Sequence, residues 1–122
     1  MEPTVFTVAD YLLTRLKQLN VTDVFQIPGD YCKHFTQTLE RFVGVNAVGA
    51  MNELDAGYAA DAYGRTRGLA AMSLQYGVST FSALNAVAGA YVERIGHLRD
   101  CSFGARIMGK SRPCWRAQSM AI

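Results

Sequence analysis

Apolar side chains recur at helical spacing near the start of the chain. Behind Thr7, one helix face collects Val8, Tyr11, Leu12, Leu16 and Leu19. Thr7 is followed three residues later by Asp10, a pairing typical of a capped helix start. The pattern predicts an opening helix. The β-branched and aromatic stretch VTDVFQIPGD then predicts a strand that runs into a turn at Pro28-Gly29.

The same order of strand, loop and helix follows twice more. After a weaker helix, roughly Tyr31 to Phe42, the stretch Val43 to Met51 is expected to be a buried strand, and NELDAGYAADAYGRTRG a helix closed by Gly68. LAAMSLQ predicts a third strand and YGVS a turn. The last helix, TFSALNAVAGAYVERI, has on one side Phe81, Leu84, Ala88, Tyr91 and Ile95.

This alternation predicts an α/β fold, a partial doubly wound parallel sheet. Ligands of such sheets bind at the carboxyl ends of the strands, so the loops that leave the strands are the places to look for chemistry. These loops carry Asp30, Glu53 and Ser79, which we expect to converge on one edge of the sheet.

Composition limits the class of protein without identifying it. The 122 residues are 50% hydrophobic and 18% charged, enough for one globular domain. Apolar runs are interrupted well before the ~20 residues of a membrane span, and the acidic start MEPTVFTVAD is unlike a signal or transit peptide. Three cysteines without a CxxC pair favour free thiols. We therefore expect a cytoplasmic protein with no membrane partner.

Charge divides the chain near residue 96. Residues 1–95 hold 7 basic and 9 acidic residues, a net charge of −2, whereas residues 96–122 hold 5 basic residues and 1 acidic residue, a net charge of +4. The basic part has no run of like charges and few aromatic residues, so we expect no nucleic-acid partner. We do not expect the organisation of the first 95 residues to extend into residues 96–122.

Three motifs carry a family resemblance over about residues 4–95. TVADYLLTRLKQLNVTDVFQIPGDY, NELDAGYAADAYGR and GVSTFSALNAVAGAYVER resemble, in order and separation, the amino-terminal pyrimidine-binding domain of the thiamine-diphosphate-dependent 2-oxo acid decarboxylases, the pyruvate and indolepyruvate decarboxylase group. The resemblance implies a 2-oxo acid substrate, thiamine diphosphate as cofactor, and a homodimer or tetramer.

The resemblance implies a role for Glu53. In the family, a glutamic acid at this position hydrogen-bonds to the aminopyrimidine of the cofactor and favours the imino tautomer, which takes the proton from the thiazolium carbon. The alternative for Glu53 is an ordinary acidic residue in the first turn of a helix, where the macrodipole contributes about 0.3–1 kcal/mol.

The resemblance also implies roles for the two neighbouring loops. Asp30 matches an aspartate that lies by the reacting carbon and takes part in substrate handling and proton transfer, although aspartate is also an ordinary turn residue. The cofactor's surroundings would include Glu53 and the residues of the two turns: Pro28, Gly29, Gly77, Val78 and Ser79.

Two groups of small residues have two open interpretations. They are Gly57, Ala60 and Gly64 on one predicted helix, with Ala83, Ala86 and Ala90 on the next. They provide faces where another backbone comes close, either within the domain or from a second subunit, as the family implies.

The sequence departs from the family at two places. Ser79-Thr80-Phe81 stands where many members have Gly-Glu-Leu, which bears on substrate preference. From Gly96 onward we expect no strand, and no GDG followed by NN occurs, so the Mg²⁺ and diphosphate site is not expected in this chain. We interpret residues 96–122 as a disordered or aberrant tail on a truncated decarboxylase and expect no turnover from it alone.

Other functions remain open from the sequence. GARIMGKS, residues 104–111, fits a phosphate-binding GxxxxGKS pattern, but its surroundings make a poor strand and Pro113 interrupts the helix that should follow. A carboligase of the acetolactate synthase type shares the glutamate. A non-catalytic fragment that pairs with a full-length subunit is the third alternative.

Overall fold

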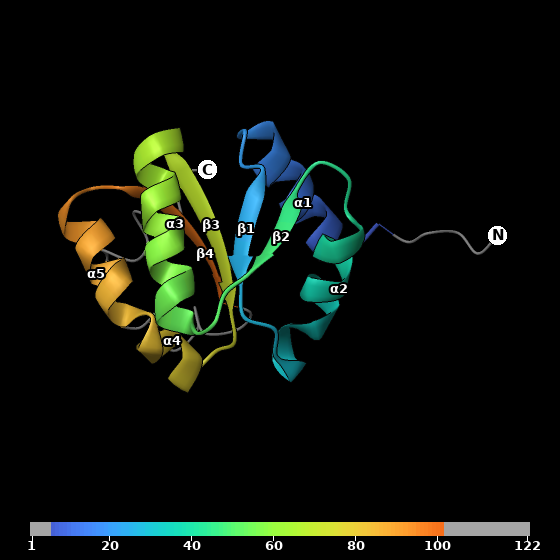
Figure 1. The fold of residues 1–122 in the computed structure, drawn as a ribbon. Coiled ribbons are helices and arrows are strands. Elements are labelled where there is room, and N and C mark those ends of the chain that lie inside the picture. Colours follow the sequence, from blue (N-terminus) through green and yellow to red (C-terminus); the bar gives the residue numbers. More distant parts are fainter. Residues whose placement is uncertain (1–5, 102–122) are drawn as a thin grey trace.

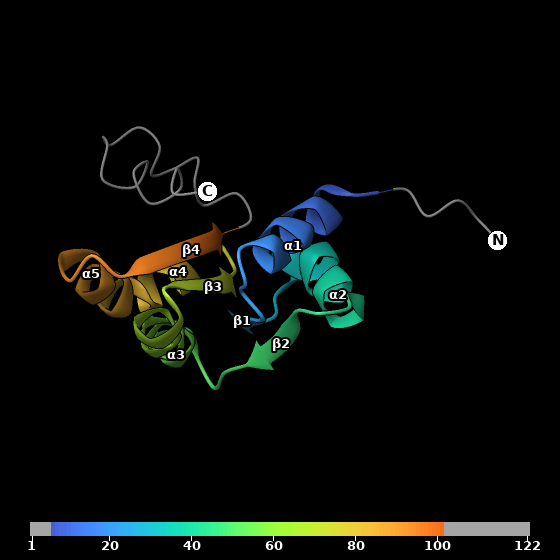
Figure 2. The same ribbon diagram turned by 90° about the horizontal axis from the view of Figure 1, so that it is seen from above.

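A four-stranded parallel sheet organises the molecule, in a computed structural model that describes residues 6–101 (Figure 1). The strand order is β2-β1-β3-β4. The strands are β1 (Asp23–Gln26), β2 (Asn46–Gly49), β3 (Leu69–Leu74) and β4 (Gly96–Cys101). β2 and β4 therefore form the two edges of the sheet (Figure 2).

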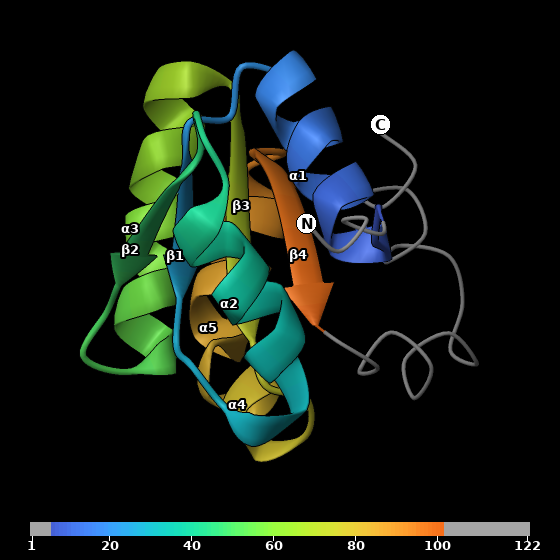
Figure 3. The ribbon, with the colours of Figure 1, turned by 90° about the vertical axis from the view of Figure 1, so that its right-hand side faces the viewer.

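Helices cover both faces of the sheet. α1 (Val8–Gln18) and α2 (Lys33–Arg41) lie on one face, and α3 (Glu53–Arg67), α4 (Val78–Ser82) and α5 (Leu84–Val92) lie on the other (Figure 3). A short 3-10 helix, η1 (Asp30–Cys32), precedes α2. The predicted α/β doubly wound architecture is confirmed.

Local sequence signals set the helix ends where they were predicted. Thr7 and Asp10 form a reciprocal capping box at the start of α1. Asn52 caps α3 by accepting a hydrogen bond from the amide of Asp55. Gly68 ends α3 with φ +88°, a backbone conformation that favours glycine.

The central strand β3 is buried on both faces and separates two apolar clusters. Ala71 packs with Leu13, Val24 and Leu39 under α1 and α2. The alternating residues of β3 pack on the opposite face with Ala56 and Ala60 of α3; they are Ala70, Met72 and Leu74. Two-sided burial of β3 follows from the helices that cover both faces of the parallel sheet.

The small residues of α3 and α5 pack against each other within this chain. A Cβ added at Gly57 would lie 2.7 Å from the Cβ of Ala86, so the two helices approach closely at this point. Ala60, Ala83 and Ala90 are also buried. The structure thus supports the interpretation of these residues as packing inside one domain.

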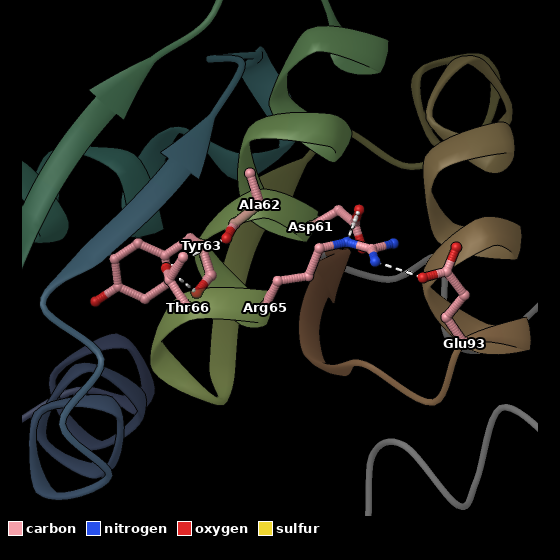
Figure 4. Close-up of polar contacts among 6 residues, drawn as sticks. All are labelled: Asp61, Ala62, Tyr63, Arg65, Thr66 and Glu93. Atoms are coloured by element: carbon pink, nitrogen blue, oxygen red, sulfur yellow. Dashed lines mark hydrogen bonds and ion pairs between the residues drawn. The ribbon is translucent and has the colours of Figure 1, made fainter.

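Charged side chains join α3 and α5 near their C-terminal ends. The guanidinium of Arg65 in α3 contacts Asp61 one turn earlier and Glu93, the residue that ends α5 (Figure 4). These hydrogen bonds raise the pKa of Arg65, with Glu93 as the first cause. Arg65 remains exposed, so the bridge is expected to add little stability.

Two elements, the strand β2 and the last predicted helix, differ from the sequence prediction. The stretch predicted as a buried strand is an edge strand of four residues whose side chains are mostly exposed, because β2 pairs only with β1. The predicted last helix is two helices joined at Ala83. Its bulky residues Phe81 and Tyr91 face outward, because only small side chains fit the close contact with α3.

The expectation that no strand follows Ile95 is wrong. β4 runs parallel to β3 with Leu69 opposite Gly96 and Leu74 opposite Cys101. Strand pairing uses backbone groups, so the open edge of β3 accepts a segment whose side-chain pattern is a poor strand signal. The GARIMGKS motif and the rest of the expected tail, residues 102–122, lie outside the described residues. None of the helices found in residues 6–101 has the length and apolar character needed to cross a membrane.

Candidate functional site

Three loops meet at the carboxyl ends of β1, β2 and β3, at the lower edge of the sheet in Figure 1. Backbone hydrogen bonds carry the pairing past the strand ends. The amide of Ile27 donates to the carbonyl of Ser73 over 3.2 Å, and the amide of Ala50 donates to the carbonyl of Gln26 over 3.2 Å. The three loops therefore lie at one edge of the sheet, as the sequence predicts.

Glu53 is positioned by the start of α3 and held by the loop after β3. It is the first residue of α3, directly behind the cap residue Asn52. The hydroxyl of Ser79, in the first turn of α4, donates a hydrogen bond to Oε1 of Glu53. Both side chains are half-buried. Among residues 6–101 no hydrogen bond to Oε2 is found, so this oxygen remains available to a ligand.

The turn before Ser79 has an open backbone and an exposed apolar side chain. Gly77 has φ +83°, and a Cβ there would meet no atom within 4 Å. The next residue, Val78, is 81% exposed. An open backbone turn, an exposed apolar side chain and a half-buried carboxylate together match the needs of an aminopyrimidine, which has an apolar face and a polar edge. The residues present fit this part of thiamine diphosphate.

The loops after β1 and β3 also contact each other. A Cβ at Gly29 would clash with the side-chain amide of Gln75, so Gly29 permits this close approach. The rings of Tyr31 and Tyr76 lie 4.7 Å apart between centroids, with an interplanar angle of 56°. A hydrogen bond with Tyr31 raises the pKa of Tyr76, because it favours the neutral phenol. The three loops thus form one connected group.

Asp30 lies at the same edge in a separate environment. It begins η1, is exposed, and lines a cavity of about 330 Å³ formed by the turn and one face of α2. The other lining residues are Pro28, Gly29, Lys33, Thr36, Gln37 and Glu40. In the part of the chain that the structure describes, no hydrogen bond joins Asp30 to Glu53 or Ser79.

Sequence reasoning missed three contributors to this edge: Gln75, the Tyr31–Tyr76 pair and Lys33. Gln75 ends the predicted strand LAAMSLQ, Tyr76 is the first residue of the predicted turn YGVS, and Tyr31 and Lys33 follow the Pro28-Gly29 turn. Position next to a strand end is a signal for them, but the pairing of Tyr31 with Tyr76 has no signal in the sequence. Within residues 6–101 no three histidine, cysteine or acidic side chains gather as a metal site.

Comparison with known proteins identifies the family. The family described as "Thiamine pyrophosphate enzyme, N-terminal TPP binding domain" matches residues 6–98. The alpha-keto-acid decarboxylase of Mycobacterium ulcerans is 48% identical over 91 residues, which are 75% of this chain and 16% of that protein. The alpha-keto-acid decarboxylase of Mycobacterium avium is 49% identical over 90 residues, 74% of this chain and 16% of that protein.

A solved structure shows the same fold. The X-ray structure of a protein from Mycobacterium smegmatis, described as a thiamin diphosphate-dependent enzyme, matches with a TM-score of 0.68 and 24% identity. The match covers 76% of this chain and 18% of that chain. This chain spans about one sixth of the length of the curated relatives it matches. Its motifs, its fold and the match over residues 6–98 show that the chain belongs to the thiamine pyrophosphate enzymes, as their N-terminal TPP-binding domain.

Proposed function

We propose that this chain forms the pyrimidine-binding side of a non-oxidative decarboxylase that acts on 2-oxo acids such as pyruvate or an aryl pyruvate. One observation carries the proposal: Glu53, half-buried at the carboxyl end of β2, keeps one carboxylate oxygen free beside an open turn. The relatives named alpha-keto-acid decarboxylase support the substrate class.

Glu53 is assigned the acid–base role. Glu53 would share a proton with the ring nitrogen of the aminopyrimidine through Oε2, the oxygen that the Ser79 hydrogen bond leaves unoccupied. When bound, thiamine diphosphate supplies a thiazolium carbon that serves as nucleophile and as electron sink for decarboxylation. Val78 and Gly77 provide the surface and the room for the ring.

Asp30 is assigned to the substrate side of the site. Asp30 is exposed and lines the cavity next to the Pro28-Gly29 turn, which Lys33 also lines. Asp30 exchanges protons with the substrate there. The diphosphate and Mg²⁺ are assigned to residues outside 6–101, in a homodimer or tetramer, so the chain alone is expected to give no turnover.

Cofactor binding by the purified chain tests the proposal. Isothermal titration with thiamine diphosphate and Mg²⁺ should give saturable binding that Glu53→Gln abolishes or weakens by at least tenfold, because the shared proton and the charge are both lost. Asp55→Asn is the matched control, since it removes an exposed carboxylate from the same first turn of α3.

The two variants separate the two interpretations of Glu53. If Asp55→Asn weakens binding as much as Glu53→Gln, the helix end acts through its general charge and the specific role of Glu53 is wrong. A decarboxylation rate above that of Glu53→Gln, measured on the chain alone with pyruvate, would refute the expected lack of turnover.

A further inference from the structure

We propose that Ser79 is a positioning residue, which fixes the Glu53 carboxylate so that Oε2 alone is presented to the cofactor. The inference rests on the proposed role of Glu53 and assigns the neighbour that makes this role possible in this chain. It begins from the hydrogen bond between the Ser79 hydroxyl and Oε1 of Glu53.

The contact joins two loops that are distant in the sequence. Glu53 follows β2, an edge strand, whereas Ser79 follows β3, the buried central strand. α4 is anchored behind Ser79 by Ala83, which is fully buried against α3. The hydroxyl therefore ties a side chain that follows an edge strand to a segment anchored in the buried contact between α3 and Ala83.

Within residues 6–101, the Ser79 side chain makes no hydrogen bond other than the one to Glu53. Its side chain does not cap α4, because the cap position is Gly77 and no side-chain hydrogen bond is made there. Its backbone carbonyl accepts from the amide of Ala83, a bond that any residue can make. The hydroxyl serves Glu53 alone, and the resemblance places glycine at this position in many relatives, so the hydroxyl is a feature of this chain.

Without the hydroxyl, the Glu53 side chain is free to turn. A glutamate has three rotatable side-chain bonds, and staggered rotamers of similar energy compete unless a contact selects one. A hydrogen bond from a neutral hydroxyl to a carboxylate is strong enough to make that selection. Because Ser79 occupies Oε1 and fixes the rotamer, Oε2 is the oxygen that has no hydrogen bond within residues 6–101 and is presented to an incoming ring nitrogen.

The first experiment measures cofactor affinity in four forms of the chain. Ser79→Ala should weaken binding of thiamine diphosphate, titrated with Mg²⁺, by about tenfold, as expected for losing a hydrogen bond to a charged group. Ser79→Thr keeps the hydroxyl and should restore the affinity. Ser82→Ala is the matched control, because Ser82 lies in the same short helix and donates to the carbonyl of Val78 instead.

The second experiment observes Glu53 with no cofactor present. Three-bond NMR couplings along the Glu53 side chain report whether it holds one rotamer. We expect a single rotamer in the unsubstituted chain, in Ser79→Thr and in Ser82→Ala, and rotamer averaging in Ser79→Ala. Circular dichroism of each variant shows whether the fold is kept.

The outcomes separate this inference from the proposed function. If Glu53→Gln weakens binding and Ser79→Ala does not, the role of Ser79 is wrong and that of Glu53 stands. If the chain does not bind, or Glu53→Gln binds equally well, the proposed function fails and the cofactor part of the inference fails with it. Equal couplings in Ser79→Ala and the unsubstituted chain would overturn the positioning role whatever the binding result.

Discussion

The close approach of α3 and α5 predicts that a single methyl group added at Gly57 destabilises the fold. Gly57→Ala places a Cβ 2.7 Å from the Cβ of Ala86, whereas ordinary contact begins at 3.4 Å. The two helices must therefore separate locally by about 0.7 Å, in a region where both are buried. Overpacking of this kind costs about 1–3 kcal/mol.

A second glycine provides the reference for this substitution. Gly89, in α5, has no atom within 4 Å of its Cβ position, so Gly89→Ala should gain about 0.5–1 kcal/mol from helix propensity alone. Gly57→Ala gains the same helix propensity, but its added methyl group clashes with Ala86. It should be less stable than Gly89→Ala by about 1–3 kcal/mol in urea unfolding followed by circular dichroism.

A double substitution shows whether the clash is the cause. Ala86→Gly removes the opposing methyl, so Gly57→Ala should be better tolerated with it than without it, and the coupling between the two changes should be about 1–3 kcal/mol. The reasoning is refuted if Gly57→Ala stabilises the chain as much as Gly89→Ala does. Additive effects of the two substitutions would refute it as well.

Three further substitutions test local features of the fold. Hydrogen bonds, first from Asn46, lower the pKa of Asp23, so its contribution to stability is full above the ordinary aspartate pKa of 3.8 and is lost as pH falls through the lower pKa of the folded state. Asp23→Asn should flatten this acid dependence of the urea midpoint. Thr7→Ala removes one half of the capping box with Asp10 and should cost about 0.5–2 kcal/mol in the same assay, and an unchanged midpoint would contradict the cap. Gly68→Ala should cost about 1–2 kcal/mol through positive φ alone, since its Cβ meets no neighbour, and an unchanged midpoint would contradict this.

Elements with local signals were predicted closely. The start of α1 follows from Thr7 and Asp10, three residues apart, and the end of α3 follows from Gly68. The alternation of strands and helices gave the parallel order of the sheet and the edge at which its loops meet. Glu53 was found because it lies inside a recognisable motif, in the loop that leaves a predicted strand.

Elements that depend on a distant partner were not predictable in this way. The expected buried strand is the exposed edge strand β2, because burial depends on how many strands lie beside it. β4 was missed because its partner is the backbone of β3, which no side-chain pattern reveals. The outward direction of Phe81 and Tyr91 depends on the separation of α3 and α5.

The sequence by itself determined the alternation of strands and helices up to Ile95, the cap of α1, the end of α3, the family and the place of Glu53 in a loop that leaves a strand. These features are set by residues a few positions apart, and short-range geometry decides them. The tertiary structure alone decided that Ser79 binds Glu53 across 26 positions, that Tyr31 meets Tyr76, and that Gly57 meets Ala86. Each of these contacts exists because the sheet brings distant segments together, and the chemistry of the site depends on which atoms then face each other.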